Sequence, residues 1–277
     1  MPKFDQSAFT NALTRRALML GAATVGVALP FSASAGLDPS DETWDAIKTD
    51  YFDDTQFKDG SHMMSLDAPK RAHDAAIVPL DIRVSNKYDI EKLTLVIDEN
   101  PVPLAAIISF GSASANASLQ TRVRINAYSY IRVIAHDRDG SLYMVKRFVK
   151  ASGGCAAPSG KDPIAAKANM GKMRLRRFSA PAPKAGTREA QVMIRHPNHS
   201  GFQMDQVTLL FVPPDFVETI VINQGDDMIL KVEGGISLSE DPNLRFFYNE
   251  DTATPITVTA YDTENRVFTQ DWSSSDA

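Results

Sequence analysis

The chain has 277 residues, a formal net charge of −5 at pH 7 and a single cysteine. A mildly acidic protein is a poor partner for nucleic acid or anionic lipid, because both attract basic surfaces. One cysteine excludes an internal disulfide. No nucleophile elbow, phosphate-binding glycine loop or pair of catalytic carboxylates stands out in the sequence, so we expect a protein without enzymatic activity.

Residues 1–35 have the pattern of a twin-arginine signal peptide. Arg15 and Arg16 directly precede a mildly apolar run that ends near Leu29, and Ala33-Ser34-Ala35 is a small-x-small cleavage site. The apolar run is too short, and too rich in alanine and glycine, to span a bilayer. We therefore expect the mature protein in a bacterial periplasm, without insertion into the membrane.

The first half of the mature chain, residues 36–155, has the pattern of a short helix followed by β-strands. Residues 41–52 place Trp44, Ile47 and Tyr51 near helical spacing, and Asp41 is available as a cap. Short apolar segments between turn residues follow, and Asp139-Gly140 is a strong two-residue hairpin signal. The predicted strands are 76–84, 92–98, 104–110, 119–125, 131–137 and 142–149.

Glycines and prolines interrupt this pattern after residue 152, which predicts a linker at residues 156–172 with one or two helical turns at 164–170. A second β series follows within residues 173–277, with hairpin turns at 223–226 and 262–265. Its predicted strands are 173–178, 190–196, 207–212, 219–222, 228–232, 244–248, 256–261 and 267–272. Regular strands without helices between them predict an all-β protein of two antiparallel sandwiches.

Cys155 lies at the end of the first predicted sandwich, between Gly153-Gly154 and Ala156-Ala157. The two glycines predict a flexible arm, because glycine adopts many backbone conformations at low steric cost. The small neighbours leave the sulfur unshielded. A free cysteine is more commonly a small buried hydrophobe, but such a residue is expected inside an apolar strand. We therefore predict an exposed thiol on a mobile tip.

The histidines offer two further candidate sites. His196 and His199 have a spacing that could place two imidazoles near one metal ion. Pro197 breaks any helix between them, and no acidic or thiol ligand lies close in sequence, so we predict no metal site. His62, His73 or His136 could pair with the cysteine in a thiol enzyme. A flexible tip holds such a geometry poorly, and we predict neither catalysis nor a cofactor.

The order of several short motifs makes the chain resemble SoxY and SoxZ, the two subunits of the periplasmic sulfur-oxidation carrier. The first half resembles SoxY, the thiol-bearing subunit, at Ala76-Ile77-Val78-Pro79, Asn100-Pro101, Arg122-Val-Arg124, Asp139-Gly140 and Gly153-Gly154-Cys155. The second half resembles SoxZ at Ile194-Arg195-His196-Pro197, Gly201-Phe202 and Asp241-Pro242-Asn243-Leu244-Arg245-Phe246.

This resemblance implies two immunoglobulin-like sandwiches, here fused into one chain, and a role in sulfur or thiosulfate oxidation. Cys155 would carry a sulfur intermediate covalently while separate redox or hydrolytic enzymes act on it. Fused carriers of this type are described beside quinoprotein (PQQ) alcohol dehydrogenases, and a docking or assembly module for such a system is the alternative function. The family's cysteine stands in Gly-Gly-Cys-Gly-Gly at a free chain end, whereas here Ala156-Ala157-Pro158 follows and both ends of the segment are tethered.

Overall fold

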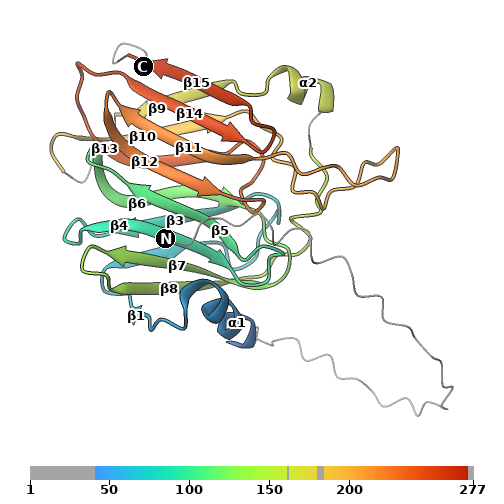
Figure 1. Cartoon of the computed structure of the whole chain (residues 1–277), viewed down its shortest axis with the longest axis horizontal. Coiled ribbons are helices and arrows are strands. Elements are labelled where there is room, and N and C mark those ends of the chain that lie inside the picture. Colours follow the sequence, from blue (N-terminus) through green and yellow to red (C-terminus); the bar gives the residue numbers. More distant parts are fainter. Residues whose placement is uncertain (1–40, 161, 180–183, 274–277) are drawn as a thin grey trace. The chain divides into compact units, whose positions relative to one another are not determined.

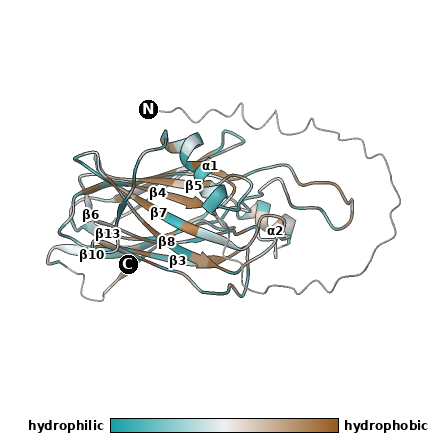
Figure 2. Cartoon of the chain, turned by 90° about the horizontal axis from the view of Figure 1, so that it is seen from below, coloured by the Kyte–Doolittle hydropathy of each residue, from teal (hydrophilic) through white to brown (hydrophobic). Residues whose placement is uncertain are grey.

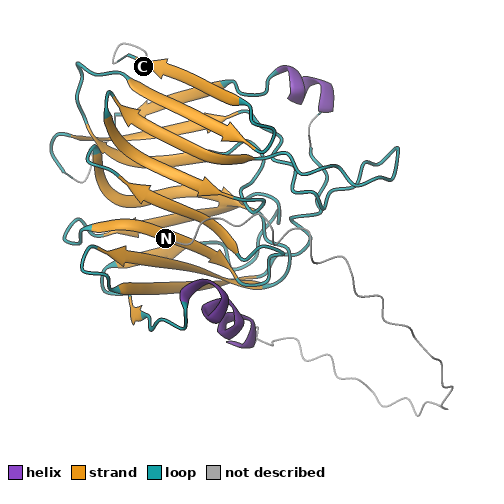
Figure 3. Ribbon diagram, in the orientation of Figure 1, coloured by secondary structure: helices purple, strands orange, loops and turns teal. Residues whose placement is uncertain are grey.

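The computed structural model describes residues 41–160, 162–179 and 184–273. The predicted signal peptide, residues 1–35, lies outside the described residues, and so does Lys161 of the predicted linker. The described chain is almost entirely β-structure with two short helices (Figure 3), which confirms the predicted all-β fold class. No helix among the described residues has the length and apolar character needed to cross a membrane.

The described residues form seventeen helices and strands. The first half contains α1 (Asp41–Phe52), β1 (Lys58–Asp59), β2 (Met64–Asp67), β3 (Val78–Val84), β4 (Ile90–Ile97), β5 (Leu104–Phe110), β6 (Ser114–Val123), β7 (Ser129–Asp137) and β8 (Leu142–Val149). The second half contains α2 (Pro163–Ala168), β9 (Met173–Phe178), β10 (Thr187–Ile194), β11 (Val217–Gln224), β12 (Asp227–Gly234), β13 (Asn243–Asn249), β14 (Ile256–Asp262) and β15 (Val267–Trp272).

The strands form two sheets, and each sheet contains strands from both halves of the chain (Figure 1). The nine-stranded sheet has the order β1-β8-β7-β4-β5-β12-β11-β14-β15, and the six-stranded sheet has the order β2-β3-β6-β13-β10-β9. The halves join where β5 pairs with β12 and where β6 pairs with β13, both antiparallel. In Figure 2 the sheets are seen as two layers, with β4 and β5 above β3, β10 and β13. The predicted boundaries between the two sandwiches stay a prediction.

One large hydrophobic cluster connects the layers and the halves. Strand β3 shows why these residues form a sandwich: Val78, Leu80 and Ile82 alternate with more exposed residues and face inward. Each such buried aliphatic side chain contributes about 1.5–3 kcal/mol. The same core cluster contains Ile108 of β5 and Val232 of β12, which lie opposite each other across the junction of the halves. Apolar side chains of both halves are therefore buried from water in the same core.

Helix α1 covers part of the outer face of the nine-stranded sheet. Trp44 and Ile47 of the helix pack on Val96 of β4 and Ile134 of β7. This covering explains why Val96 is buried on the outer face of β4, while Leu95 and Ile97 are buried on its inner face. The predicted helix over residues 41–52 is confirmed.

Two short strands were not predicted, and one predicted strand is wrong. Strands β1 and β2 contain two and four residues, too few to show an alternating pattern. Residues 207–212 were predicted as a strand because they are apolar, but they belong to an irregular hairpin that contains an isolated β-bridge between Met204 and Phe211. The predicted helical turns in the linker are confirmed as α2, where Asp162 Oδ1 caps the helix by accepting from Ala165 N at 2.8 Å.

Candidate functional site

The side chain of Cys155 is buried, with 0% of its surface exposed, in a turn that follows β8. The predicted exposed thiol is therefore wrong. The small neighbouring side chains, which suggested an unshielded sulfur, instead allow other parts of the chain to approach it closely.

Two backbone hydrogen bonds place the residues before the cysteine against the chain that follows β6. Gly153 N donates to Asn126 O at 2.8 Å, and Gly154 N donates to Ile125 O at 2.9 Å. A Cβ atom on Gly154 would lie 2.1 Å from Ala75 O, and Gly153 has a φ of +79°. The glycines are thus required by a close approach and a left-handed turn. Their role as a flexible arm stays a prediction.

Two side chains from the second half hold the cysteine segment from the other side. Ser200 Oγ donates to the backbone oxygen of Cys155 at 2.5 Å, and Gln203 Nε2 donates to that of Ala157 at 3.0 Å. Both side chains are buried, and Gln203 Oε1 also accepts from Ser200 N at 3.3 Å. We call Ser200 and Gln203 the clamp. It grips backbone oxygens, so it holds the segment without bonding to the sulfur.

Arg124 is the charged group that acts on the thiol from within the fold. Its side chain is 2% exposed, and its Nη1 donates to Asn198 O at 2.5 Å and Leu238 O at 3.1 Å. Among the described residues, no hydrogen-bond partner faces its buried Nε. Arg124 therefore connects the end of β6 to the same loop that carries the clamp.

The environment of Cys155 keeps its sulfur protonated. Burial raises the pKa of the thiol to about 11, although the positive charge of Arg124 opposes this shift. A thiol with this pKa is ionised in only about one molecule in 10⁴ at pH 7. Since the thiolate is the nucleophile, the buried cysteine reacts only slowly as a nucleophile.

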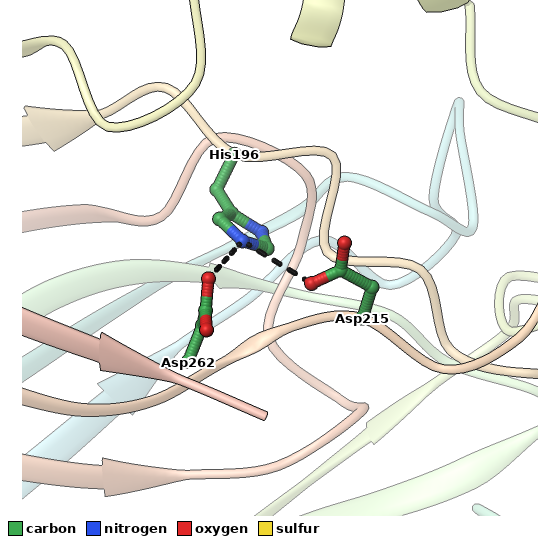
Figure 4. Close-up of side chains that lie close together, drawn as sticks. All are labelled: His196, Asp215 and Asp262. Atoms are coloured by element: carbon green, nitrogen blue, oxygen red, sulfur yellow. Dashed lines mark hydrogen bonds and ion pairs between the residues drawn. The ribbon is translucent and has the colours of Figure 1, made fainter. Parts of the chain in front are cut away.

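A second polar cluster contains His196, Asp215 and Asp262 (Figure 4). His196 Nε2 lies 3.3 Å from Asp262 Oδ2 and 3.6 Å from Asp215 Oδ1. Its Nδ1 accepts from Asn198 N at 3.1 Å, so the ring proton is on Nε2, directed at the carboxylates. Burial lowers the pKa of His196.

Arg266 supplies the positive charge that these two carboxylates need. Its Nε donates to Asp262 Oδ2 at 2.6 Å, and its guanidinium also pairs with Asp215. The guanidinium of Arg266 already engages one oxygen of each acid, and a metal ion would have to compete with it for these carboxylates. We interpret the cluster as a structural link between the loop after β10 and the turn between β14 and β15.

The hydrogen bonds of two other candidate histidines do not involve the thiol. His199 Nδ1 faces Gln203 Oε1 at 3.0 Å, and His136 Nε2 faces Thr94 Oγ1 at 2.8 Å between β7 and β4. In the part of the chain that the structure describes, no hydrogen bond joins a histidine to Cys155.

Two family models match the chain in tandem. Residues 48–155 match SoxY, described as sulfur oxidation protein SoxY, and residues 176–273 match SoxZ, described as sulphur oxidation protein SoxZ. The chain is a SoxY–SoxZ fusion. SoxY and SoxZ are carrier and interaction proteins rather than enzymes. The SoxY match ends at Cys155, and the clamp that holds this residue belongs to the SoxZ half.

Solved structures give more distant likenesses. The sulfur carrier protein SoxY from Chlorobium limicola f. thiosulfatophilum is 20% identical with a TM-score of 0.34, covering 40% of this chain and 92% of its own. The fibronectin(III)-like modules of CbhA from Clostridium thermocellum are 10% identical with a TM-score of 0.23, covering 76% and 91%. Comparison with curated proteins finds no match.

Sequence reasoning missed the clamp and Arg124 as partners of the cysteine. Ser200 and Gln203 surround the motif Gly201-Phe202, which pointed to the SoxZ likeness but not to a contact with the thiol segment. A polar side chain that bonds a distant backbone oxygen has no local signature, because its partner lies more than forty residues away in the chain.

Proposed function

We propose that this SoxY–SoxZ fusion is a periplasmic carrier that holds a sulfur-containing intermediate on Cys155 and presents it to enzymes of sulfur oxidation. The observation that carries the proposal is the position of Cys155. The only cysteine of the chain is the last residue of the SoxY match, and two side chains of the SoxZ half donate to the backbone oxygens of Cys155 and Ala157. The signal-peptide pattern of residues 1–35 supports the periplasmic location.

A buried thiol is compatible with a carrier if the cysteine segment, residues 153–157, detaches reversibly from the rest of the fold. Four hydrogen bonds hold residues 153–157 to the rest of the fold, two from the backbone of Gly153 and Gly154 and two from the clamp. At about 1 kcal/mol each, breaking all four bonds costs about 4 kcal/mol. The thiol is then exposed in about one molecule in 10³. This population is small enough to protect the thiol and large enough for a partner enzyme to capture.

Protection has a clear value in an oxidising compartment. Exposed thiols on two carrier molecules would combine to a disulfide and lose both sites. On loading, Cys155 gives up its proton, its sulfur forms an S–S bond with a reduced sulfur anion, and the partner redox enzyme accepts the two electrons. Hydrolytic enzymes then act on the bound fragment.

Intact-mass measurement of the protein from native periplasm tests this function. We expect a mass increase that maps to Cys155, disappears with a reducing agent and is absent from the Cys155→Ser variant. A thiol that stays bare in cells actively oxidising reduced sulfur compounds would contradict the carrier function.

The burial of Cys155 favours one second candidate, a docking or assembly module for a quinoprotein dehydrogenase system. A module that carries nothing has no need of an accessible thiol. It predicts that Cys155→Ser supports the dehydrogenase pathway as well as the unmodified chain does, whereas a carrier loses all function with this substitution.

A further inference from the structure

The hairpin that follows the clamp exposes an unusual concentration of apolar side chains. Of the twelve large hydrophobic residues that are exposed in the described chain, six lie within residues 202–211, and Val207 has 91% of its surface exposed. This hairpin is the loop that extends to the right in Figure 1, and it is largely brown in Figure 2. The six are Phe202, Met204, Val207, Leu209, Leu210 and Phe211. We call residues 202–212 the finger.

The tip of the finger is built by Asp205. Its carboxylate accepts from Val207 N at 3.0 Å, and from the backbone N and Oγ1 of Thr208 at 2.7 and 2.9 Å. Its backbone accepts from Leu209 N and donates to Leu210 O, both at 2.9 Å. These bonds hold Leu209 at a φ of +58°, which leucine rarely adopts. The exposed apolar tip is thus held in one conformation and does not collapse onto the fold.

The base of the finger is bonded to the segment that carries the thiol. Val212 N donates to Gln203 O at 2.8 Å, and the side chain of Gln203 donates to Ala157 O. Below this, His199 and Asp215 exchange two backbone hydrogen bonds of 2.7 and 3.0 Å. A protein that binds the finger is therefore held beside the cysteine segment.

The charge of the finger indicates what it binds. Residues 202–212 contain no lysine or arginine, and their one acid, Asp205, has its carboxylate engaged by the turn. A surface without basic residues has no attraction for anionic lipid. An apolar recess in a protein, with the rigid tip already in its bound shape, is the matching partner.

We propose that the finger docks into an apolar recess of the enzyme that loads or unloads Cys155. The inference rests on the proposed carrier function, and it adds the surface by which the SoxZ half selects that enzyme. Docking at the finger brings the enzyme to the clamp, where the thiol segment is released.

Two separate crosslinking experiments on this protein test the docking. A photoreactive benzoylphenylalanine replaces Leu210 in the full chain in native cells, and Cys155 is separately trapped as a mixed disulfide with its enzyme. We expect both crosslinks to capture the same enzyme. Capture of that enzyme through Cys155 alone, or a Leu210 crosslink only to a second copy of this chain, would overturn the inference and leave the carrier function standing.

A double variant measures the contribution of the finger. Leu210→Ser with Phe211→Ser should lower loading of Cys155 in cells at least 10-fold, while the rate of alkylation by iodoacetamide stays unchanged. Ile164→Ser on α2 is the matched control, since Ile164 is 81% exposed and lies outside the finger.

Normal loading of the double variant would overturn the inference. The inference would also be overturned if the unmodified chain sedimented with phosphatidylglycerol vesicles and the double variant did not, because lipid would then be the target. An unmodified chain that never carries a load contradicts the carrier function itself.

Discussion

Ser200 donates a hydrogen bond from its hydroxyl to the backbone oxygen of Cys155, although the two residues belong to different halves of the fusion. The SoxZ half thereby holds the only cysteine of the chain in place. Since the bond reaches the backbone oxygen and not the sulfur, the clamp can reopen without breaking any bond to the thiol.

Removing the clamp should expose the thiol. Ser200→Ala deletes one hydrogen bond worth about 1 kcal/mol, so alkylation of Cys155 by iodoacetamide should become about 5-fold faster. Ser112→Ala is the control, because Ser112 bonds Asp227 on the surface at 2.7 Å and should leave the rate unchanged. Equal rates in all three proteins would show that the hydroxyl does not restrain the segment.

Gly154 should tolerate no side chain while the thiol of Cys155 is buried. A Cβ atom there meets Ala75 O at 2.1 Å, so Gly154→Ala should expel the segment and accelerate alkylation at least 10-fold. Gly160→Ala should have no such effect, because nothing lies within 4 Å of its Cβ position. A slow thiol in the Gly154→Ala chain would mean that Ala75 and the backbone move aside.

The stability of the fold should depend on the ionisation of the thiol. Burial raises the pKa of Cys155 from 9.0 to about 11, so the folded chain holds this proton more tightly than the unfolded chain. The resulting stabilisation is complete below about pH 9 and is lost as the pH rises towards 11. It amounts to about 2–3 kcal/mol. Urea unfolding at pH 7 and pH 10.5 should show this loss in the unmodified chain and not in Cys155→Ser.

A load on the sulfur should hold the segment open. Because Cys155 is 0% exposed, we expect an added sulfur fragment to crowd the residues around it. After alkylation of Cys155, hydrogen exchange at the amides of Gly153 and Gly154 should become at least 10-fold faster, while the amide of Ile220 in β11 stays protected. Unchanged exchange at both glycines would show that the residues around Cys155 accommodate the adduct.

Arg124 should stabilise the fold far more than a surface arginine. Arg124→Met leaves the buried oxygens of Asn198 and Leu238 without this donor and should lower the free energy of unfolding by about 3 kcal/mol. Arg138→Met removes an exposed pair with Asp89 and should cost less than about 1 kcal/mol. Urea titration of both variants at pH 7 measures the difference.

Local pattern was sufficient for most of the strands. Strands β5 and β8 were predicted with their observed ends, because short apolar segments between turn residues are visible in the sequence. The pairing of β5 with β12 and of β6 with β13 was not predictable in this way. It depends on which strands lie at the sheet edges, a property that residues more than one hundred positions apart decide together.

The site was predicted less well than the fold, for the same reason. Composition singled out Cys155, but its burial depends on Ala75, Ile125 and the clamp, which are brought together only by the assembled sheets. The apolar residues 207–212 gave the opposite error. Apolar character predicted a strand there, whereas these residues form an exposed hairpin whose tip is built by Asp205.

The pairing of β5 with β12 and of β6 with β13 also explains what joining the two halves achieves. Two separate chains meeting at these edges would dissociate on dilution, and each would expose unpaired strand edges open to aggregation. Within one polypeptide the stoichiometry is fixed at one to one, and the local concentration of each half around the other does not depend on expression level. Every thiol is therefore made together with the partner that covers it.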